Sequence, residues 1–394
     1  MGFLTPFSSK IKRSLAMEIS TASINVMLFE NGSADKPKIT AHYRRQQSFE
    51  MLRDVEKFQR FTLINISDLF QEIRKKEQDC CFKDIVVGFS APFYIARTAD
   101  LTKRFGSYHQ ISKNDVGTLL KTGEQQIMEE FAGNDLSVFE ATVLKNMLNG
   151  YHVEDVINRY AEMLSIKVRY AALHSSFFEE IKKMVSIFGC SPNIQLFTFP
   201  ALYARLLRDV VTKRGLQVFI DFGGETTEIT LLKNAIIYQI FTVPFGIVEV
   251  LKGIMEKFSV DHQNAVMLTN SYMKRILEEE KLQQVDQMIK NILQRWAVSI
   301  SDILEGISRA PNDTFSIFLL GDAAAMPGLK EALKTTPALK NIQHSVNIQH
   351  VSPMAFQEYA QSAVLLSDPG DLGLVGLVLV SSKQADKELH IAAR

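Results

Sequence analysis

The fold of this chain is decided by the stretch Val218-Phe-Ile-Asp221-Phe-Gly223-Gly224-Glu225-Thr226-Thr227-Glu228-Ile-Thr230-Leu-Leu232. Its apolar opening, from Val218 to Ile220, predicts a buried strand with the carboxylate of Asp221 at its end. Gly223 and Gly224 permit a tight turn, after which alternating residues predict a second strand. The same pattern also describes an ordinary β-hairpin, in which the two glycines do no more than make the turn.

The turn of this hairpin carries groups that bind phosphate and metal. Because Gly223 and Gly224 have no Cβ, the backbone N–H groups of the turn can approach an anion and form a nest for it. The hydroxyl groups of Thr226 and Thr227 add further donors. An aspartate beside such a nest is well placed to hold Mg²⁺, usually through water, which makes Asp221 the candidate metal residue.

Two further segments have related patterns. The first is Ser14-Leu-Ala-Met-Glu18-Ile-Ser20-Thr21-Ala22-Ser23-Ile-Asn-Val-Met-Leu-Phe29, in which two apolar strands flank an acidic residue and a small polar turn. The second is Ser316-Ile-Phe-Leu-Leu320-Gly321-Asp322-Ala323-Ala324-Ala325-Met326-Pro327-Gly328-Leu329. It predicts a strand, a turn of small residues and the start of a helix, with Pro327 near the first helical position.

In order and spacing, these segments resemble the phosphate-1, phosphate-2 and adenosine motifs of the actin-like ATPase superfamily. The resemblance implies an α/β, actin-like (ribonuclease H-like) fold of two lobes, with a cleft between them that binds ATP and Mg²⁺. Carried over to this chain, Glu18 and the turn Ser20–Ser23 would lie at the phosphates together with Gly223–Thr227. Gly321–Ala324 would border the nucleoside, and Asp221 would hold Mg²⁺ through water.

Within the superfamily, the chain resembles the bacterial FtsA and PilM group. Asp84-Ile-Val-Val-Gly-Phe-Ser-Ala-Pro92 is similar to the strand and loop by which these proteins leave the first actin subdomain. Lys145–Tyr151 and Ser165–His174, followed by a helix-like run from Phe177 to Phe188, resemble their small inserted subdomain. That subdomain is a partner-binding module in the family.

The resemblance implies a division of the chain into lobes. A tail, 1–13, precedes a first lobe in two parts, 14–96 and 176–214, with a small α+β subdomain, 97–175, inserted between them. The second lobe, 215–394, includes a helical part at about 245–310. Its apolar segment Leu372–Val380 is too short to span a membrane and is expected to form a buried helix at the base of this lobe.

The chain departs from the family in three of its motifs. The phosphate-1 turn has Glu18 and Ser20 where the family usually has an aspartate and a glycine. The helix that contacts the ribose, matched here by Val260–Leu268, has lost the glutamate and lysine of the family. In the adenosine loop Gly321 is followed by Asp322 instead of a second glycine. A carboxylate near a polyphosphate is repulsive unless it points away or meets a cation.

These departures leave more than one function open. If the cleft binds ATP, the chain is at most a weak ATPase, and its ligand favours a closed over an open arrangement of the lobes. If the cleft binds none, the chain is a nucleotide-free pseudo-ATPase adaptor with the same fold. A sugar or acetate kinase would need an acceptor pocket with a positioned catalytic carboxylate, and we identify none between the hairpins.

The composition is that of a globular protein large enough for two or more domains. Of 394 residues, 46% are hydrophobic and 22% are charged, which excludes wholesale disorder. Acidic and basic residues number 44 each, which argues against a dedicated nucleic-acid surface. Among the 3 cysteines, Cys80 and Cys81 are adjacent, and the spacing matches neither a disulfide framework nor a zinc motif, as expected in a reducing cytoplasm.

Membrane recruitment is expected to depend on a partner. Residues 2–13 have the spacing of a short amphipathic helix with basic residues, which predicts weak membrane contact, or else packing on the first lobe or a partner. The tail Ser382–Arg394 is too polar and short to serve as the C-terminal membrane helix that FtsA relatives commonly carry. This favours a PilM-like protein, which is recruited through the cytoplasmic peptide of a membrane-anchored protein.

The expected protein is therefore a cytoplasmic scaffold or adaptor, peripheral at the inner face of the cell membrane. The resemblance implies a role in type IV pilus or secretion assembly if the chain is PilM-like, and in cell division if it is FtsA-like. It also implies possible self-association into filaments.

Overall fold

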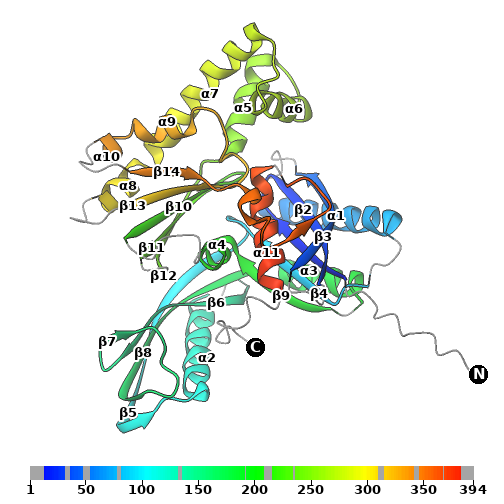
Figure 1. Cartoon of the computed structure of the whole chain (residues 1–394). Coiled ribbons are helices and arrows are strands. Elements are labelled where there is room, and N and C mark those ends of the chain that lie inside the picture. Colours follow the sequence, from blue (N-terminus) through cyan, green and yellow to red (C-terminus); the bar gives the residue numbers. More distant parts are fainter. Residues whose placement is uncertain are drawn as a thin grey trace, which may run out of the picture.

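The computed structural model describes residues 13–31, 36–47, 54–77, 81–131, 135–190, 192–207, 215–233, 236–308, 315–340, 346–366 and 368–382. The segment predicted to contact a membrane, apart from Arg13, and the tail beyond Ser382 lie outside these residues. Three sheets organise the chain (Figure 1). Among the described helices, none has both the length and the apolar character that crossing a bilayer requires.

The first sheet grows from the hairpin predicted at Glu18. β1 (Arg13–Ile19) pairs antiparallel with β2 (Ser23–Asn31) and parallel with β4 (Asp84–Phe89). The full strand order is β15-β3-β2-β1-β4-β9. The remaining strands are β3 (Pro37–Gln46), β9 (Asn193–Thr198) and β15 (Gln361–Ser362). The middle of β1, residues 15–17, is apolar and buried because both faces of the strand are covered, as in buried sheets generally.

Alternate residues of β1 face two different hydrophobic cores. Leu15 and Met17 pack with residues of α1 (Val55–Lys76) and α3 (Ser175–Phe188), whereas Ala16 belongs to a core on the opposite face. The run Phe177–Phe188, which resembled part of the inserted subdomain, is therefore a helix of the first lobe. Its side chains Phe177 and Phe188 are fully buried beside the first sheet.

The second sheet repeats the strand arrangement of the first. β10 (Leu216–Phe222) pairs antiparallel with β11 (Thr227–Lys233) and parallel with β13 (Phe315–Leu320), as β1 does with β2 and β4. The edge strands are β12 (Ile236–Val243) and β14 (Asn347–His350). The strands predicted on both sides of Gly223 and before Gly321 are thus confirmed.

Among the described residues, six helices accompany the second sheet. They are α5 (Ile247–Phe258), α6 (His262–Met273), α7 (Glu279–Ser299), α8 (Ser301–Ser308), α9 (Leu329–Lys334) and α10 (Pro337–Lys340). On α7, Trp296 is fully buried and stacks on Phe222 with ring centres 5.1 Å apart. Its Nε1 donates a 2.9 Å hydrogen bond to Thr227 Oγ1, so the tryptophan fastens α7 to the second hairpin.

A third, smaller sheet is inserted after β4 of the first lobe and extends away from the other two (Figure 1). Its order is β5-β8-β6-β7, with all neighbours antiparallel. These strands are β5 (Ile95–Gln110), β6 (Leu136–Leu148), β7 (Tyr151–Val153) and β8 (Tyr160–His174). α2 (Lys113–Glu130) packs on this sheet and buries Val116 and Ile127, which gives the predicted α+β composition.

The C-terminal helix lies elsewhere than we predicted. α11 (Leu372–Ser381) packs on β1, β2 and β4 and on α4 (Phe199–Leu206), and therefore covers the first sheet instead of the base of the second lobe. A Cβ on Gly373 would lie 2.6 Å from the Phe199 ring, so small residues in α11 permit this close approach. Before it, η2 (Pro353–Phe356), β15 and η3 (Pro369–Asp371) lead the chain back to the first lobe.

Candidate functional site

The turns of the two hairpins touch one another. The backbone N–H of Glu225 donates a 2.9 Å hydrogen bond to Thr21 Oγ1. A Cβ on Gly224 would lie 2.4 Å from this oxygen and 2.7 Å from the Ala22 nitrogen, closer than real Cβ atoms come. Glycine is therefore required at this position because the first turn packs directly against the second.

The first turn is held by its own hydroxyl groups. The Ser23 N–H donates to Ser20 Oγ at 3.1 Å, and the Ser20 hydroxyl donates to the Ser23 carbonyl at 3.0 Å. Gln47, which follows β3, donates from Nε2 to the Ser20 carbonyl at 2.6 Å. Ser20 is thus committed to the structure of the turn, and a ligand would meet Thr21, Ala22 and Ser23 instead.

The second turn is tied to its own lobe and to the first. The N–H groups of Ile247 and Val248, at the start of α5, donate to the carbonyls of Gly223 and Gly224 at 3.0 Å each. The Thr226 hydroxyl donates to the Ala91 carbonyl at 3.1 Å. Thr227 Oγ1 accepts the hydrogen bond from Trp296 and donates to the Phe245 carbonyl, 2.6 Å away. The two hydroxyl groups predicted as phosphate donors therefore both have protein partners.

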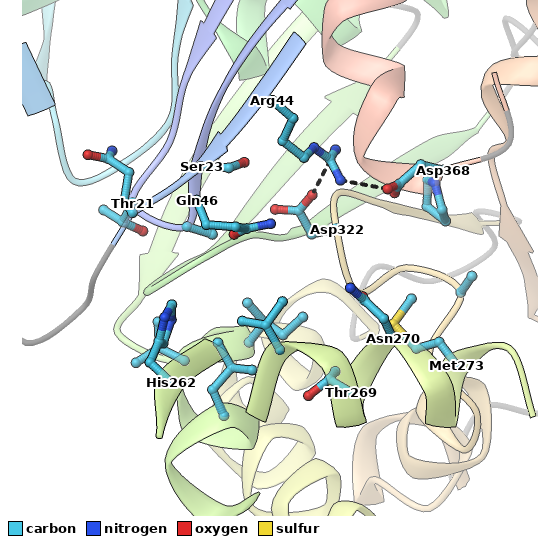
Figure 2. A pocket seen from close by; sticks show the side chains of 18 of the residues that line it. Thr21, Ser23, Arg44, Gln46, His262, Thr269, Asn270, Met273, Asp322 and Asp368 are labelled. Atoms are coloured by element: carbon cyan, nitrogen blue, oxygen red, sulfur yellow. Dashed lines mark hydrogen bonds and ion pairs between the residues drawn. The ribbon is translucent and has the colours of Figure 1, made fainter. Parts of the chain in front are cut away.

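A cleft of about 400 Å³ lies beside these turns, between the two lobes (Figure 2). The first lobe contributes the turn Thr21–Ser23 together with Arg44, Gln46 and Gln47. The opposite wall is formed by the start of α5 and by one face of α6. That face presents His262, Val266, Thr269, Asn270 and Met273.

The cleft includes only part of the site that the resemblance implied. Thr21, Ala22, Ser23 and Asp322 line it. The other candidates are not among its lining residues. They are Glu18, Ser20, Asp221, Gly223, Gly224, Glu225, Thr226, Thr227, Gly321, Ala323 and Ala324.

The adenosine loop is shaped by two left-handed glycines. Gly321 has φ +87° and Gly328 has φ +88°, a region that favours glycine. Gly328 is the N-cap of α9, so Pro327 lies directly before the cap and thus near the first helical position, as predicted. As the sequence indicates, α6 lacks the glutamate and lysine that the family has in this helix. Lys274, directly after α6, nevertheless lines the cleft.

Acidic side chains of the two lobes face one another behind the cleft. Burial raises the pKa of Glu18 well above its usual value, and the charges of Asp322 and Asp221 raise it further. Burial likewise raises the pKa of Asp221, with the charges of Glu228 and Asp322 adding to the effect. A Cβ on Gly321 would lie 2.1 Å from Asp221 Oδ1, so this carboxylate packs against the adenosine loop.

Arg44 of β3 lies among these carboxylates, and sequence reasoning missed it. Its Nη1 is 2.6 Å from Asp368 Oδ2, and its Nη2 is 3.5 Å from Asp371 Oδ1 and 3.9 Å from Asp322 Oδ1. Burial alone would lower the pKa of Arg44, but the surrounding carboxylates raise it above its ordinary value. Asp322 therefore meets a cation, one of the two conditions under which its charge is tolerable beside a polyphosphate.

The donor set does not suit a directly bound Mg²⁺ ion. Within the described ranges, no group of three or more aspartate, glutamate, histidine or cysteine side chains is arranged to hold a metal. Asp221 packs against Gly321, and Arg44 lies between the other carboxylates. Mg²⁺ usually keeps several waters and takes one or two carboxylates together with substrate phosphates, but here Asp221 is not among the lining residues of the cleft and Asp322 faces Arg44.

Comparison of the sequence with protein-family models and with curated proteins gives no match. Among solved structures, the chain is similar to the PilM–PilN type IV pilus biogenesis complex, with a TM-score of 0.65 and 17% identity over 93% of this chain and 97% of that one. EutJ, an ethanolamine utilization protein from Carboxydothermus hydrogenoformans, gives a TM-score of 0.47 and 10% identity over 93% and 89%. The chain thus has the actin-like fold of the PilM group, as the hairpins predicted, and at this identity the likeness shows the fold alone.

Proposed function

We propose that this actin-like chain is an adaptor whose cleft binds an adenine nucleotide and whose lobes respond to that nucleotide. The contact between Thr21 and Glu225 carries the proposal, since it joins the two lobes beside one cleft, which Thr21 lines from the first lobe and Ile247 and Asp322 line from the second. A ligand seated there touches both lobes. It therefore favours the arrangement in which the lobes are close together, to the extent that its affinities for the closed and open arrangements differ.

The chemistry of the cleft suits a nucleotide. Ile247, Leu251, Val266 and Met273 supply apolar surface for a base, as ligand pockets generally do. Polar groups for a ribose and phosphates come from Ser23, Arg44, Gln46, Asn270 and Lys274, which line the same space.

We expect binding with at most slow hydrolysis. A general base must lie within hydrogen-bonding reach of the water that it activates. Glu228, the acidic residue opposite Asp221 in the second hairpin, instead accepts hydrogen bonds from the Tyr94 hydroxyl and the Ala91 N–H. Neither Asp221 nor Glu228 is among the residues that line the cleft.

A buried polar chain supports communication between the cleft and the inserted subdomain. Glu228 of the second lobe binds Tyr94, which precedes the insert. The Arg169 guanidinium of β8 lies 5.4 Å from the centre of the Tyr94 ring, and its Nη1 is 3.6 Å from Glu140 Oε1 on β6. Glu140 also accepts a 2.6 Å hydrogen bond from the Thr198 N–H in the first sheet. Movement of the second lobe can thus reach the insert through side chains in contact.

The partner that we propose is a membrane-anchored assembly protein, held through its cytoplasmic peptide. The solved structure with the higher likeness is a PilM–PilN complex of type IV pilus biogenesis, which favours pilus or secretion assembly over cell division for this chain. The chain would then act in the cytoplasm at the inner face of the membrane. Filament formation stays a prediction.

A nucleotide-free adaptor is the second candidate, and one observation favours it. Thr21 already accepts the Glu225 N–H, a donor that a phosphate would otherwise receive. Calorimetry with ATP and ADP separates the two functions. We expect one nucleotide bound per chain. We also expect a raised unfolding midpoint, because a ligand at a hundredfold excess over its Kd stabilises the folded state by about 2.7 kcal/mol. Absence of heat and of any midpoint shift at millimolar nucleotide would leave the nucleotide-free adaptor.

A further inference from the structure

We propose that the guanidinium of Arg44 is a built-in counter-ion for the carboxylates beside the cleft, and that the cleft consequently takes its polyphosphate ligand without a divalent metal. For its ligand, this inference rests on the nucleotide site proposed above. For the role of Arg44, it rests on the ion pairs alone.

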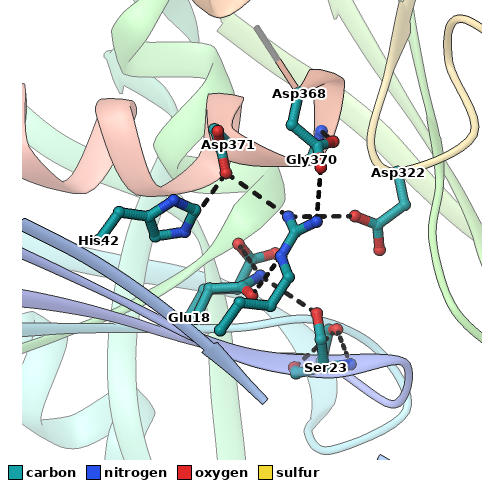
Figure 3. Close-up of polar contacts among 10 residues, drawn as sticks. Glu18, Ser23, His42, Asp322, Asp368, Gly370 and Asp371 are labelled. Atoms are coloured by element: carbon teal, nitrogen blue, oxygen red, sulfur yellow. Dashed lines mark hydrogen bonds and ion pairs between the residues drawn. The ribbon is translucent and has the colours of Figure 1, made fainter. Parts of the chain in front are cut away.

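Arg44 is surrounded by three carboxylates from two separate parts of the chain. Asp322 belongs to the adenosine loop of the second lobe, whereas Asp368 is the N-cap of η3 and Asp371 is its last residue, directly before the C-terminal helix. Figure 3 shows these three carboxylates pointing towards a common centre, with Glu18 of β1 below them. A divalent cation would be attracted to the same centre of negative charge, where the guanidinium already lies.

The arginine is held in place by its neighbours. Its Nε donates a 2.8 Å hydrogen bond to Asn25 Oδ1, and Asn25 in turn donates from Nδ2 to Ser23 Oγ at 3.1 Å and to Glu18 Oε2 at 3.3 Å. A Cβ on Gly370 would lie 2.1 Å from Asp322 Oδ1 and 2.9 Å from Arg44 Nη2. Glycine at 370 therefore leaves the space in which Arg44 meets Asp322.

Arg44 combines this pairing with access to the cleft. Its side chain is 24% exposed and lines the cleft, and Figure 2 shows it between Asp322 and Asp368. A guanidinium has five N–H groups, so it can hold carboxylates and a phosphate oxygen at the same time. In a nucleotide complex, it would offset the charge of the phosphates and that of Asp322, which is the role of Mg²⁺ in metal-dependent sites.

The charge role is tested without nucleotide. We would measure the thermal unfolding midpoint of the wild type, Arg44→Gln and Arg45→Gln, each in EDTA and in millimolar Mg²⁺ or Ca²⁺. Arg45 is the matched control, since it follows Arg44 on β3 but pairs with Asp68 and Glu72 at the surface. We expect only Arg44→Gln to lose stability in EDTA and to recover it with the metal, because its carboxylates then need another cation.

A wild-type midpoint that rises with Mg²⁺ as much as that of Arg44→Gln would overturn the counter-ion role, as would an Arg44→Gln variant insensitive to metal. If Arg44→Gln does not fold, Arg44→Lys keeps one positive charge. It should then fold with a midpoint below that of the wild type and independent of the metal, and dependence on Mg²⁺ would count against the inference.

Binding of the nucleotide without a divalent metal is tested by titrating the wild type with ATP in EDTA and in Mg²⁺. We expect the two affinities to agree within about threefold, a difference below 1 kcal/mol. A loss of about tenfold or more in EDTA overturns metal independence and leaves the proposed nucleotide site intact. Absence of binding in both buffers overturns the nucleotide site, and the unfolding experiment still decides the role of Arg44.

Discussion

The backbone N–H of Glu225 donates a 2.9 Å hydrogen bond to the side-chain oxygen of Thr21, although the two residues are 204 positions apart in the chain. Each residue lies in the turn of an antiparallel hairpin that begins the sheet of its own lobe. Thr21 is 1% exposed, so this contact is shielded from water. The two lobes are therefore in direct contact through the turns that define the fold.

Replacement of Thr21 by valine should loosen this contact. The substitution keeps the shape of the side chain but removes the acceptor of the part-buried Glu225 N–H, which costs about 0.5–1.5 kcal/mol. We expect a lower free energy of unfolding and faster hydrogen exchange at the Glu225 amide. Thr40→Val is the control, because the Thr40 hydroxyl donates to the Leu28 carbonyl at 3.2 Å within one sheet. Unchanged exchange at Glu225 in Thr21→Val would show that the turns do not touch in solution.

Gly321 and Gly328 have nearly the same backbone conformation but differ in how closely their neighbours pack, so alanine substitutions at the two positions isolate the cost of close packing. Both have positive φ, +87° and +88°, so alanine at either position costs about 1 kcal/mol of backbone strain. At Gly321 the new Cβ would also lie 2.1 Å from Asp221 Oδ1, whereas at Gly328 its nearest neighbour, Leu293, would be 3.6 Å away.

We therefore expect Gly321→Ala to lose about 1–3 kcal/mol more than Gly328→Ala in urea unfolding, which is the usual cost of overpacking. Equal losses in the two variants would place the Asp221 carboxylate away from the adenosine loop.

Stability should depend on pH through Asp371. Burial, together with the charges of Asp368 and Asp322, raises the pKa of Asp371 to about 7 against the lowering effect of Arg44. Between pH of about 4 and 7, the folded state thus binds more protons than the unfolded state, and its stability falls as pH rises. Asp371→Asn removes this loss of stability, because asparagine does not ionise. Urea midpoints should therefore show the variant gaining stability relative to the wild type between pH of about 5 and 8.

His42 should give a change of opposite sign. Its Nε2 is 3.5 Å from Asp371 Oδ1, and burial and the charge of Arg44 lower its pKa to about 4. The unfolded state then binds more protons between pH of about 4 and 6.5, so this residue contributes stability that is lost on acidification. Relative to the wild type, His42→Gln should lose stability as pH rises from about 4 to 7. The same direction of change in both variants would contradict these assignments.

Filling the cleft should weaken nucleotide binding. Val266 lines the cleft from α6, whereas Met267, the next residue of the helix, is 58% exposed. We expect Val266→Trp to weaken ATP binding at least about tenfold, or 1.4 kcal/mol, and Met267→Trp to leave it unchanged. Calorimetry on variants with wild-type circular dichroism provides the measurement. Wild-type affinity in Val266→Trp would place the nucleotide outside this cleft.

The sequence alone determined the hairpins and, through their order, the fold. An apolar run, an acidic residue and a turn of small residues are contiguous, and the strands at Glu18, Asp221 and Leu320 form as this pattern predicts. Apolarity also predicted that Leu372–Val380 is buried, but not on which surface, because a helix that is apolar on all sides can pack against either lobe.

Only the tertiary structure decided the electrostatics of the site. Arg44 and Asp368 are 324 positions apart, and nothing in the polar run around Arg44 distinguishes it from Arg45. Their different partners follow from the register of β3, which directs neighbouring side chains to opposite faces. Hydrophobic periodicity and turn chemistry belong to consecutive residues and can be recognised in the sequence. The pairing of charges depends on which surfaces meet after folding, and so only the packed chain reveals it.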